Sequence, residues 1–360
     1  MPNKKKQSQG EKQGKNGYAF SAPFFLLAFL GIVAVAASLW FVLGTGGNQI
    51  DEIVHEPIDL NIAYEGARHP LSGERVDDDE TFKLFAVMVE NSQDAWPLSG
   101  IEDSYLVFEA PVEGNITRFM AMYSDDQDVD EIGPVRSARP YYVDLVLGWD
   151  ALYAHVGGSP EALDLIKERG VNDLNEFFNG GSFWRSRRRS APHNVYTETS
   201  RLIAGWDRVI EDEQEYETRL FKKSKIEDEP PEEYEVEVEF NGYGYDVTWV
   251  YDPEQNAYVR HQAGSEYKLR SGAGIAVQNV AIMKTQTSVI DNIGRQKITT
   301  VGGGDAQIHM DGQVIDGTWE KDLRSTIMRF YDDAGDEIVW NVGKTWVEVV
   351  DEDRNEVLES

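Results

Sequence analysis

An almost wholly apolar run, residues 20–43, most constrains what this chain can fold into, because it is long enough to cross the roughly 30 Å hydrocarbon core of a bilayer. Five lysines and one glutamate precede it within residues 1–17, and the next charged residue after it is Asp51. By the positive-inside rule, residues 1–17 form a cytoplasmic tail and residues 18–44 a single transmembrane helix. The bulk of the chain is then extracellular, and the protein belongs to the cell membrane.

A cleaved signal peptide is the alternative interpretation of this run. The Ala-Val-Ala sequence at residues 34–36 resembles a cleavage site, but residues 39–43 continue the apolar run past it. The apolar region of a signal peptide is usually shorter than this. The pattern therefore favours an uncleaved anchor.

Composition narrows the chemistry that the extracellular part can carry. The chain has no cysteine, which excludes disulfides, a thiol nucleophile and lipidation at a cysteine, and suits a Gram-positive type of envelope. It also lacks the HExxH and EF-hand patterns, so we expect neither a metal site nor a cofactor.

The net charge of the chain is −30, and the first 17 residues carry +4, so the remainder carries −34. Such a surface repels anionic lipid and nucleic acid, and we do not expect nucleic acid as a partner. The acidity serves either solubility in a saline or alkaline medium or the binding of a cationic partner.

The length of 360 residues fits two folded domains behind the anchor. Residues 45–66 are polar and acidic and predict a stalk. An acidic segment with paired prolines, residues 226–234, has the composition of a linker. It separates an N-terminal α+β or α/β domain, residues 67–225, from a smaller, mainly β domain, residues 235–355.

Local patterns predict the elements of both domains. Before the linker, Val- and aromatic-rich runs predict strands, and helical spacing predicts two helices. A third helix should begin after Ser159, a good N-cap, with Pro160 in its first turn, and end at Gly170. After the linker the runs alternate like strands, and Asp311-Gly312 predicts a hairpin turn. The predicted strands of the first domain are residues 84–89, 105–110, 116–123 and 151–156, and the other two helices are residues 139–147 and 198–210.

Two arginines three positions apart, Arg136 and Arg139, form the first candidate ligand site. Guanidinium groups grip phosphate or carboxylate bidentately. They can equally pair with Glu109 or Glu113 within the protein, and both arrangements can hold together if the glutamates orient the arginines. Arg118, on a predicted strand, belongs to the same candidate cluster.

The second candidate site lies where a predicted strand ends at His155, followed by Gly157, Gly158 and Ser159 at the start of a helix. Backbone N–H groups at a helix N-terminus can bind an anion, and glycines allow a ligand to approach them. His155 could donate to that anion or transfer a proton. The alternative is an ordinary Gly-Gly turn before a helix.

A third candidate site is an arginine-rich segment, residues 185–189, with His193 and Asn194 shortly after it. Arginines beside aromatic residues can bind phosphate or stack on rings. Alternatively, the segment is a solvated loop that contacts acidic surface or a lipid headgroup. His193 and Asn194 are typical proton-handling and orienting groups.

These segments resemble the YerB-like family of bacterial envelope proteins, described as two linked domains of unknown function. The resemblance spans about residues 67 to 350, and implies an envelope location but no reaction, substrate or cofactor. Some members are described as lipoproteins, a label that cannot transfer to a cysteine-free chain. The segments that carry the resemblance are residues 109–114, 117–119, 133–140, 155–159 and 191–194, with weaker support from 311–312, 317–319 and 343–346.

We therefore expect a membrane-anchored extracytoplasmic protein that binds an anionic envelope ligand, a phosphorylated or carboxylated glycan or wall fragment. One alternative is an envelope hydrolase or a phosphoryl or glycosyl transferase using the same pocket, with catalytic candidates His155, His193, Glu109 and Glu113. Another is an envelope-assembly scaffold that binds envelope proteins and no small ligand. The predicted ligand-binding residues are Arg118, Arg136, Ser137, Arg139, His155, Gly157, Gly158, Ser159, Arg185, His193 and Asn194.

Overall fold

The computed structural model describes residues 66–212, 214–223, 235–240, 244–353 and 357–359. The predicted cytoplasmic tail, the anchor at 18–44, almost all of the stalk and the linker at 226–234 lie outside these residues. Within the described part of the chain, no helix combines the length and the apolar character needed to cross a bilayer.

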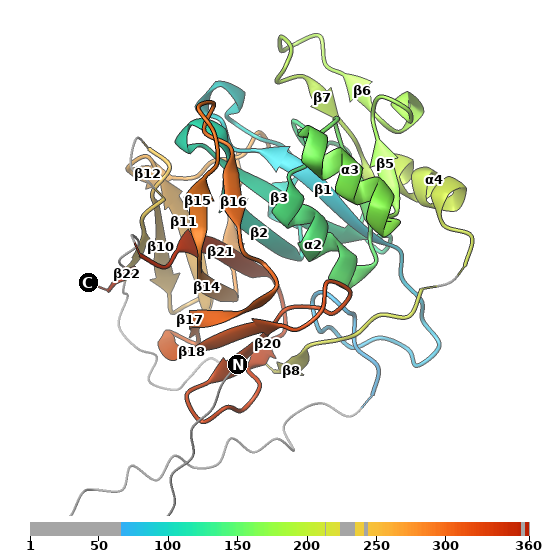
Figure 1. Cartoon of the computed structure of the whole chain (residues 1–360). Coiled ribbons are helices and arrows are strands. Elements are labelled where there is room, and N and C mark those ends of the chain that lie inside the picture. The colour runs from blue at the N-terminus through green and yellow to red at the C-terminus, as the bar shows by residue number, and fades with distance from the viewer. Residues whose placement is uncertain (1–65, 213, 224–234, 241–243, 354–356, 360) are drawn as a thin grey trace, which may run out of the picture. The chain divides into compact units, whose positions relative to one another are not determined.

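A ten-stranded sheet, ordered β19-β18-β17-β14-β21-β2-β3-β1-β4-β5, forms the centre of the fold (Figure 1). Strand β1 pairs antiparallel with β3 and parallel with β4, and β2 pairs parallel with β21. Strand β1 is buried along its whole length, because both faces of the sheet are covered. The bounds are β1 Leu84–Glu90, β2 Leu106–Pro111, β3 Thr117–Ser124, β4 Leu152–His155, β5 Asp173–Asn175, β14 Asn279–Thr285, β17 Gly302–Met310, β18 Gln313–Lys321, β19 Arg329–Asp332 and β21 Thr345–Asp351.

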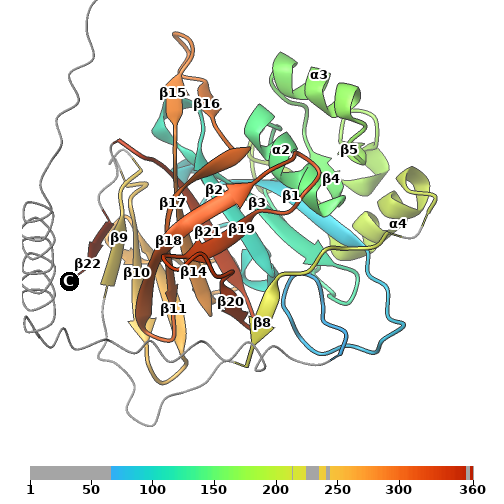
Figure 2. The ribbon, with the colours of Figure 1, turned by 60° about the horizontal axis from the view of Figure 1, so that its bottom comes forward.

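A six-stranded sheet, built wholly from residues after the predicted linker, packs on one face of the large sheet. Figure 2 shows its strands β9, β10 and β11 beside β14 and β17. Three two-stranded sheets complete the strand pairing. The remaining strands are β6 Trp184–Arg185, β7 Val195–Tyr196, β8 Leu220–Lys222, β9 Glu235–Val238, β10 Val247–Asp252, β11 Ala257–Gln262, β12 Ser265–Glu266, β13 Ala276–Val277, β15 Thr287–Val289, β16 Gln296–Ile298, β20 Val339–Asn341 and β22 Val357–Glu359.

The helices cover both faces of the large sheet. Helices α2 (Pro140–Trp149) and α3 (Pro160–Arg169) pack on one face, with Met88 and Met120 in the core beneath them. Helix α4 (Thr199–Val209) packs on the opposite face, which it shares with the six-stranded sheet. In the described part of the chain, four 3-10 turns lie in the connections: η2 Gln93–Ala95, η3 Ile101–Asp103, η4 Glu113–Asn115 and η5 Gly180–Ser182.

The start and end of α3 follow from its sequence. Ser159 Oγ accepts a hydrogen bond from the N–H of Ala162, Pro160 occupies the first turn, and Gly170 ends the helix at φ +66°. Each residue satisfies a rule of helix termini, because the end groups lack partners within the helix. The predicted cap, first turn and stop of this helix are confirmed.

The fold is α+β, as predicted, but strand pairing joins the two predicted domains. Strands β14, β17, β18, β19 and β21 come from the C-terminal segment and complete the sheet begun by the N-terminal one. The predicted hairpin turn at Asp311-Gly312 is confirmed, since it joins β17 to β18. Among the described strands, the six-stranded sheet and the small β15–β16 sheet belong to the C-terminal segment alone. Local periodicity predicts strands but not which distant strand each one pairs with, so the sequence did not reveal the shared sheet.

Candidate functional site

Most of the predicted site residues lie at one edge of the large sheet. Strands β1, β2, β4 and β5 all end at this edge and β3 begins there, because β3 alone among them runs in the opposite direction. In α/β sheets, ligands bind in the crevice outside the carboxyl ends of the strands. We call this side of the sheet the carboxyl edge.

Glu90 ends β1 at this edge and is only 2% exposed. Its Oε2 atom lies 2.9 Å from Nδ1 of His193 and 3.6 Å from Nε of Arg136. Burial raises the pKa of the Glu90 carboxyl, and the charges of Arg136 and His193 act in the opposite direction. The other oxygen, Oε1, is buried and accepts no hydrogen bond from the described residues. Shifted carboxyl groups beside cations are common in functional sites.

Arg118 brings another guanidinium to Glu90 from the next strand, because the two residues are directly paired between β3 and β1. Its Nη1 donates to the carbonyl of Ser137 at 2.6 Å. Burial, and then the nearby charges of Arg139 and Arg136, lower the pKa of Arg118 to about 10, so it remains protonated at neutral pH. We call Glu90, Arg118, Arg136 and His193 the Glu90 cluster.

Arg136 is partly accessible in this cluster. Its side chain is 24% exposed, and its Nη1 donates to the carbonyl of Pro192 at 3.1 Å. Its backbone N–H donates to Met88 and its carbonyl accepts from Val156, so the segment crosses between the ends of β1 and β4. A guanidinium has five N–H donors, so this arrangement leaves donors available to a ligand.

Arg139 makes an internal ion pair next to the Glu90 cluster. Its Nε and Nη2 donate to the two oxygens of Glu113 at 2.7 and 2.5 Å, and its Nη1 donates to the Ala138 carbonyl. Burial opposes ionisation of Glu113, but the hydrogen bonds and charge of Arg139 outweigh it and lower the pKa of Glu113. Glu113 thus orients an arginine, as predicted. This pairing uses Nε and Nη2 of Arg139, the two donors with which the guanidinium would bind a ligand bidentately.

His155 forms a separate buried group at the end of β4. Its Nδ1 lies 2.7 Å from the Gly157 carbonyl and its Nε2 lies 2.8 Å from Oδ1 of Asp173. Both partners are acceptors, so only the doubly protonated imidazole ring satisfies both. His155 is fully buried and does not reach the Glu90 cluster through any contact of the described residues.

The glycine turn after His155 uses its backbone donors within the protein. The N–H of Gly157 donates to Oδ1 of Asn175 at 3.0 Å, and the N–H of Ser159 donates to the Ala138 carbonyl at 3.3 Å. Gly157 has φ +59°, and a Cβ there would lie 2.7 Å from the ring of Phe177. A Cβ at Gly158 would touch Ala138 at 3.3 Å. The predicted anion donors of this turn therefore serve the local fold.

Arg185 and Asn194 pair with each other across the β6–β7 hairpin, away from Glu90. Nη1 of Arg185 donates to Oδ1 of Asn194 at 3.3 Å, and Nη2 donates to Glu176 at 3.0 Å. Of the predicted set, Arg118, Arg136, Ser137 and His193 converge, whereas Arg185 and Asn194 form a separate surface pair.

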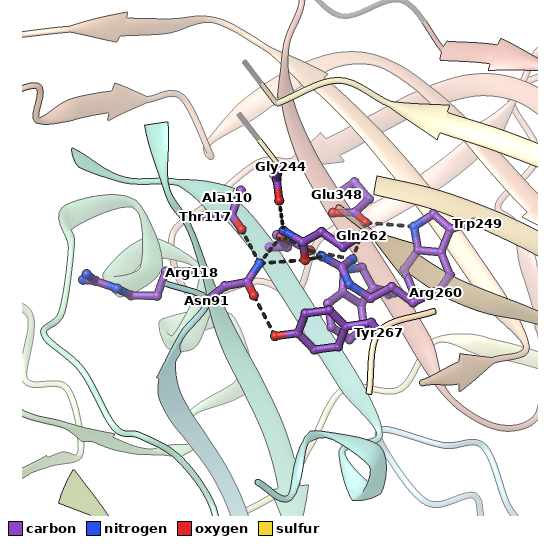
Figure 3. Close-up of polar contacts among 12 residues, drawn as sticks. Asn91, Ala110, Thr117, Arg118, Gly244, Trp249, Arg260, Gln262, Tyr267 and Glu348 are labelled. Atoms are coloured by element: carbon purple, nitrogen blue, oxygen red, sulfur yellow. Dashed lines mark hydrogen bonds and ion pairs between the residues drawn. The ribbon is translucent and has the colours of Figure 1, made fainter. Parts of the chain in front are cut away.

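Glu109 was expected beside the arginines of the site, but it lies on the opposite face of the sheet. Its oxygens accept from Arg260, at 2.8 Å from Nη1 and 3.1 Å from Nη2. Arg260 Nη1 also lies 3.2 Å from Glu348. In Figure 3, Arg260 and Glu348 face each other while Arg118 points away from them. Side chains alternate between the two faces of a sheet along a strand. Ala110 is paired with Arg118, so its neighbour Glu109 points to the opposite face.

This second group, the Arg260 network, joins the two sheets. Asn91, the residue after Glu90, donates to Thr117 at 2.8 Å and to Gln262 of the six-stranded sheet at 3.2 Å. Its Oδ1 accepts from Tyr267 at 2.7 Å. The sequence motifs did not indicate Glu90, Asn91, Arg260 or Glu348. What could have indicated them is a polar residue on the side of a strand where the other residues are apolar and therefore expected to be buried.

The comparisons with known proteins agree with the motifs. The model of "Protein of unknown function (DUF3048) N-terminal domain" matches residues 71–212, and that of the corresponding C-terminal domain matches residues 236–347. A Bacillus subtilis (strain 168) protein named "Putative lipoprotein YerB" is 33% identical over 289 residues, covering 78% of this chain and 85% of the relative. The chain belongs to the YerB-like family.

The fold also matches a solved family member. The crystal structure of the YerB protein from Bacillus subtilis superposes with a TM-score of 0.72 at 31% identity, covering 81% of this chain and 99% of that one. The two family models divide the chain on either side of the predicted linker. Because this chain contains no cysteine, the lipid attachment implied by that relative's name has no counterpart residue here.

Proposed function

We propose that this chain is a membrane-anchored extracytoplasmic protein that binds an anionic group of a cell-envelope ligand at the Glu90 cluster. The ligand class is a phosphorylated or carboxylated glycan or wall fragment. The observation that carries the proposal is the gathering of Arg118, Arg136 and His193 around one buried carboxyl. In a chain whose residues after 17 carry −34, a local gathering of cations departs from the surrounding charge and can attract an anion.

The envelope location rests on the family and on the sequence. The Bacillus subtilis relative is named a lipoprotein, and membrane attachment outside the cell fits that name. In this chain, the apolar run at residues 20–43 takes the place of a lipid as the anchor.

The donor set of the cluster suits an oxyanion that also carries a hydroxyl group. Nε of Arg118 is buried and donates no hydrogen bond within the described structure, and Oε1 of Glu90 accepts none. Nε of Arg136 faces Oε2 of Glu90 at 3.6 Å, beyond hydrogen-bond distance. Buried polar atoms usually have partners, so such atoms at one place point to a missing one. A phosphate or carboxylate would accept from the guanidinium groups, and a neighbouring sugar hydroxyl would donate to Glu90.

Loss of Arg136 is expected to weaken binding of such an anion about tenfold or more, since hydrogen bonds to charged groups contribute about 1.5–3 kcal/mol. The full chain in detergent would be screened by thermal shift against inorganic phosphate, sugar phosphates, a glycerol phosphate polymer and soluble wall fragments. Binding of any of these to the folded state raises the apparent melting temperature. The shift should be much smaller in Arg136→Ala.

The matched control is Arg324→Ala, which removes a more exposed arginine that also pairs with a carboxylate, Asp144. The control should keep the full ligand shift. An equal shift in wild type and Arg136→Ala would contradict the proposed site. No shift with any probe, together with an intact fold, would favour the scaffold alternative and direct the search to envelope proteins.

A hydrolase or transferase is the second candidate, favoured by one contact. The 2.9 Å hydrogen bond between His193 and Glu90 joins a partly exposed imidazole to a carboxyl with a raised pKa, which is suitable for proton transfer. If this pair is catalytic, Glu90→Gln and His193→Gln should abolish turnover of a bound ligand and leave most of its thermal shift. Turnover that survives both substitutions would rule out these two groups.

A further inference from the structure

Two neighbouring aromatic side chains project from the loop after β5. Phe177 is 67% exposed and Phe178 is 83% exposed. An aromatic side chain buries about 150–250 Å² when it is covered, so leaving two of them in water forgoes substantial stabilisation. Single exposed apolar residues need no explanation, but an adjacent aromatic pair at this degree of exposure does.

The loop is held in this conformation by one buried residue, Asn175, through both its side chain and its backbone carbonyl. The side-chain Oδ1 of Asn175 accepts from the N–H of Phe177 at 3.2 Å. Its backbone carbonyl accepts from the N–H groups of Phe178 at 3.0 Å and Asn179 at 2.9 Å. The same Oδ1 accepts from Gly157, which ties the loop to the turn before α3. The rings are therefore presented by a fixed backbone.

An arginine-rich hairpin lies beside this loop. Arg185, on β6, forms an ion pair with Glu176, the residue before Phe177, at 3.0 Å. Arg187 and Arg188 follow in the β6–β7 connection, and both are exposed. In Figure 1, β5, β6 and β7 lie together at the end of the large sheet. We call Phe177, Phe178, Arg187 and Arg188 the aromatic-arginine surface.

We infer that the aromatic-arginine surface docks on the anionic face of the phospholipid bilayer. Aromatic rings partition to the headgroup level of a membrane, and arginines bind lipid phosphate bidentately. Residues after 17 carry −34, and an anionic bilayer repels such a chain everywhere except where cations gather. Within the arginine-rich residues 185–189, the exposed Arg187 and Arg188 are therefore complementary to that bilayer.

The expected anchor holds the folded part near the bilayer, so the bilayer is the surface that it can contact. The stalk at residues 45–66 spans at most about 75 Å when fully extended, so the folded part remains close to the membrane surface. A tether of this kind raises the local concentration of the second site, and even weak docking is then populated. Because β5 ends at the carboxyl edge, docking would also turn the Glu90 cluster toward the membrane.

The absence of cysteine from the chain allows a site-specific test. Gly180 follows the aromatic pair, and a Cβ added there meets no atom within 4 Å, so Gly180→Cys should accept an NBD fluorophore without disturbing the fold. The matched control is Asp333→Cys, in the exposed turn after β19, which lies at the opposite edge of the sheet. Each labelled full chain would be reconstituted in vesicles of phosphatidylcholine with or without phosphatidylglycerol.

We expect the Gly180 label to shift to shorter wavelength and gain intensity only in vesicles that contain phosphatidylglycerol, while the Asp333 label stays unchanged. The shift should be lost with Phe177→Ser and Phe178→Ser combined, and with Arg187→Gln and Arg188→Gln combined. It should also weaken on going from 0.1 M to 1 M salt, as the Debye length falls from about 10 to about 3 Å. No shift at Gly180, an equal shift in both lipids, or an equal shift at Asp333 would overturn the inference.

Discussion

Replacing Arg260 with methionine is expected to lower the free energy of unfolding by about 3–5 kcal/mol, the usual effect of breaking a buried ion pair by removing one partner. Arg260, Glu109 and Glu348 are all fully buried. Methionine fills a similar volume, so the loss of packing is small and the effect reports on charge. Without the guanidinium, the buried Glu109 carboxyl is left with neutral donors such as Nε1 of Trp346 at 3.1 Å.

Aromatic rings add to the role of this arginine. Its guanidinium carbon lies 4.8 Å from the ring centre of Trp346 and 5.5 Å from those of Phe119 and Trp249. Desolvated cation–π contacts of this kind contribute up to about 2 kcal/mol. These rings come from both sheets, so the charge of Arg260 stabilises the contact between them.

Urea unfolding of the full chain, followed by tryptophan fluorescence, would measure this loss. The matched control is Arg295→Met on the β15–β16 hairpin, where the arginine pairs with Asp291 at the surface and solvent screens the pair, so its loss should change stability little. A triple variant, Arg260→Met with Glu109→Gln and Glu348→Gln, should recover much of the loss because it leaves no unpaired charge. Equal losses for Arg260→Met and Arg295→Met would contradict the predicted role of the network.

The contrast between predicted and observed structure follows from the range of the interactions involved. Ser159, Pro160 and Gly170 set the limits of α3 through contacts within a few residues, so the sequence pattern sufficed. The parallel pairing of β2 with β21 joins Leu106 to Thr345, more than 200 residues apart. Nothing in the alternation of either strand specifies that partner, because any strand edge offers the same backbone groups.

The candidate site was predicted only in part, because it too depends on contacts between residues far apart in the sequence. Arg136 and His193 were found because cations stand out in an acidic chain. Glu90 was missed because a single acidic residue after an apolar strand is usually a solvated strand end, and only the fold shows it to be buried. Glu109 was assigned to the wrong face, since alternation along β2 separates two faces without saying which one carries the site.

At pH 8, Glu348→Gln is expected to leave the free energy of unfolding unchanged or to raise it by up to about 1 kcal/mol. Glu109→Gln should lower the same free energy by about 1 kcal/mol or more. Burial, followed by the charge of the paired Glu109, raises the pKa of Glu348 well above its ordinary value. Glu109 accepts from both Nη atoms of Arg260, and Glu348 accepts only from Nη1. The raised pKa thus assigns the proton of this buried group to Glu348, whereas geometry makes Glu109 the bidentate partner of Arg260.

The direction in which stability changes with pH tests this assignment. A carboxyl whose pKa is raised by folding binds its proton more tightly in the folded state, so its stabilising contribution is complete below 4.5 and is lost as pH rises through the raised value. Glutamine keeps the acceptor for Nε1 of Trp249, at 2.9 Å in the wild type, and has no proton to lose. Urea midpoints from pH 5 to 9 should therefore fall less steeply in Glu348→Gln than in wild type. A steeper fall in that variant, or a greater loss of stability than in Glu109→Gln, would show that the charges are assigned to the wrong carboxyls.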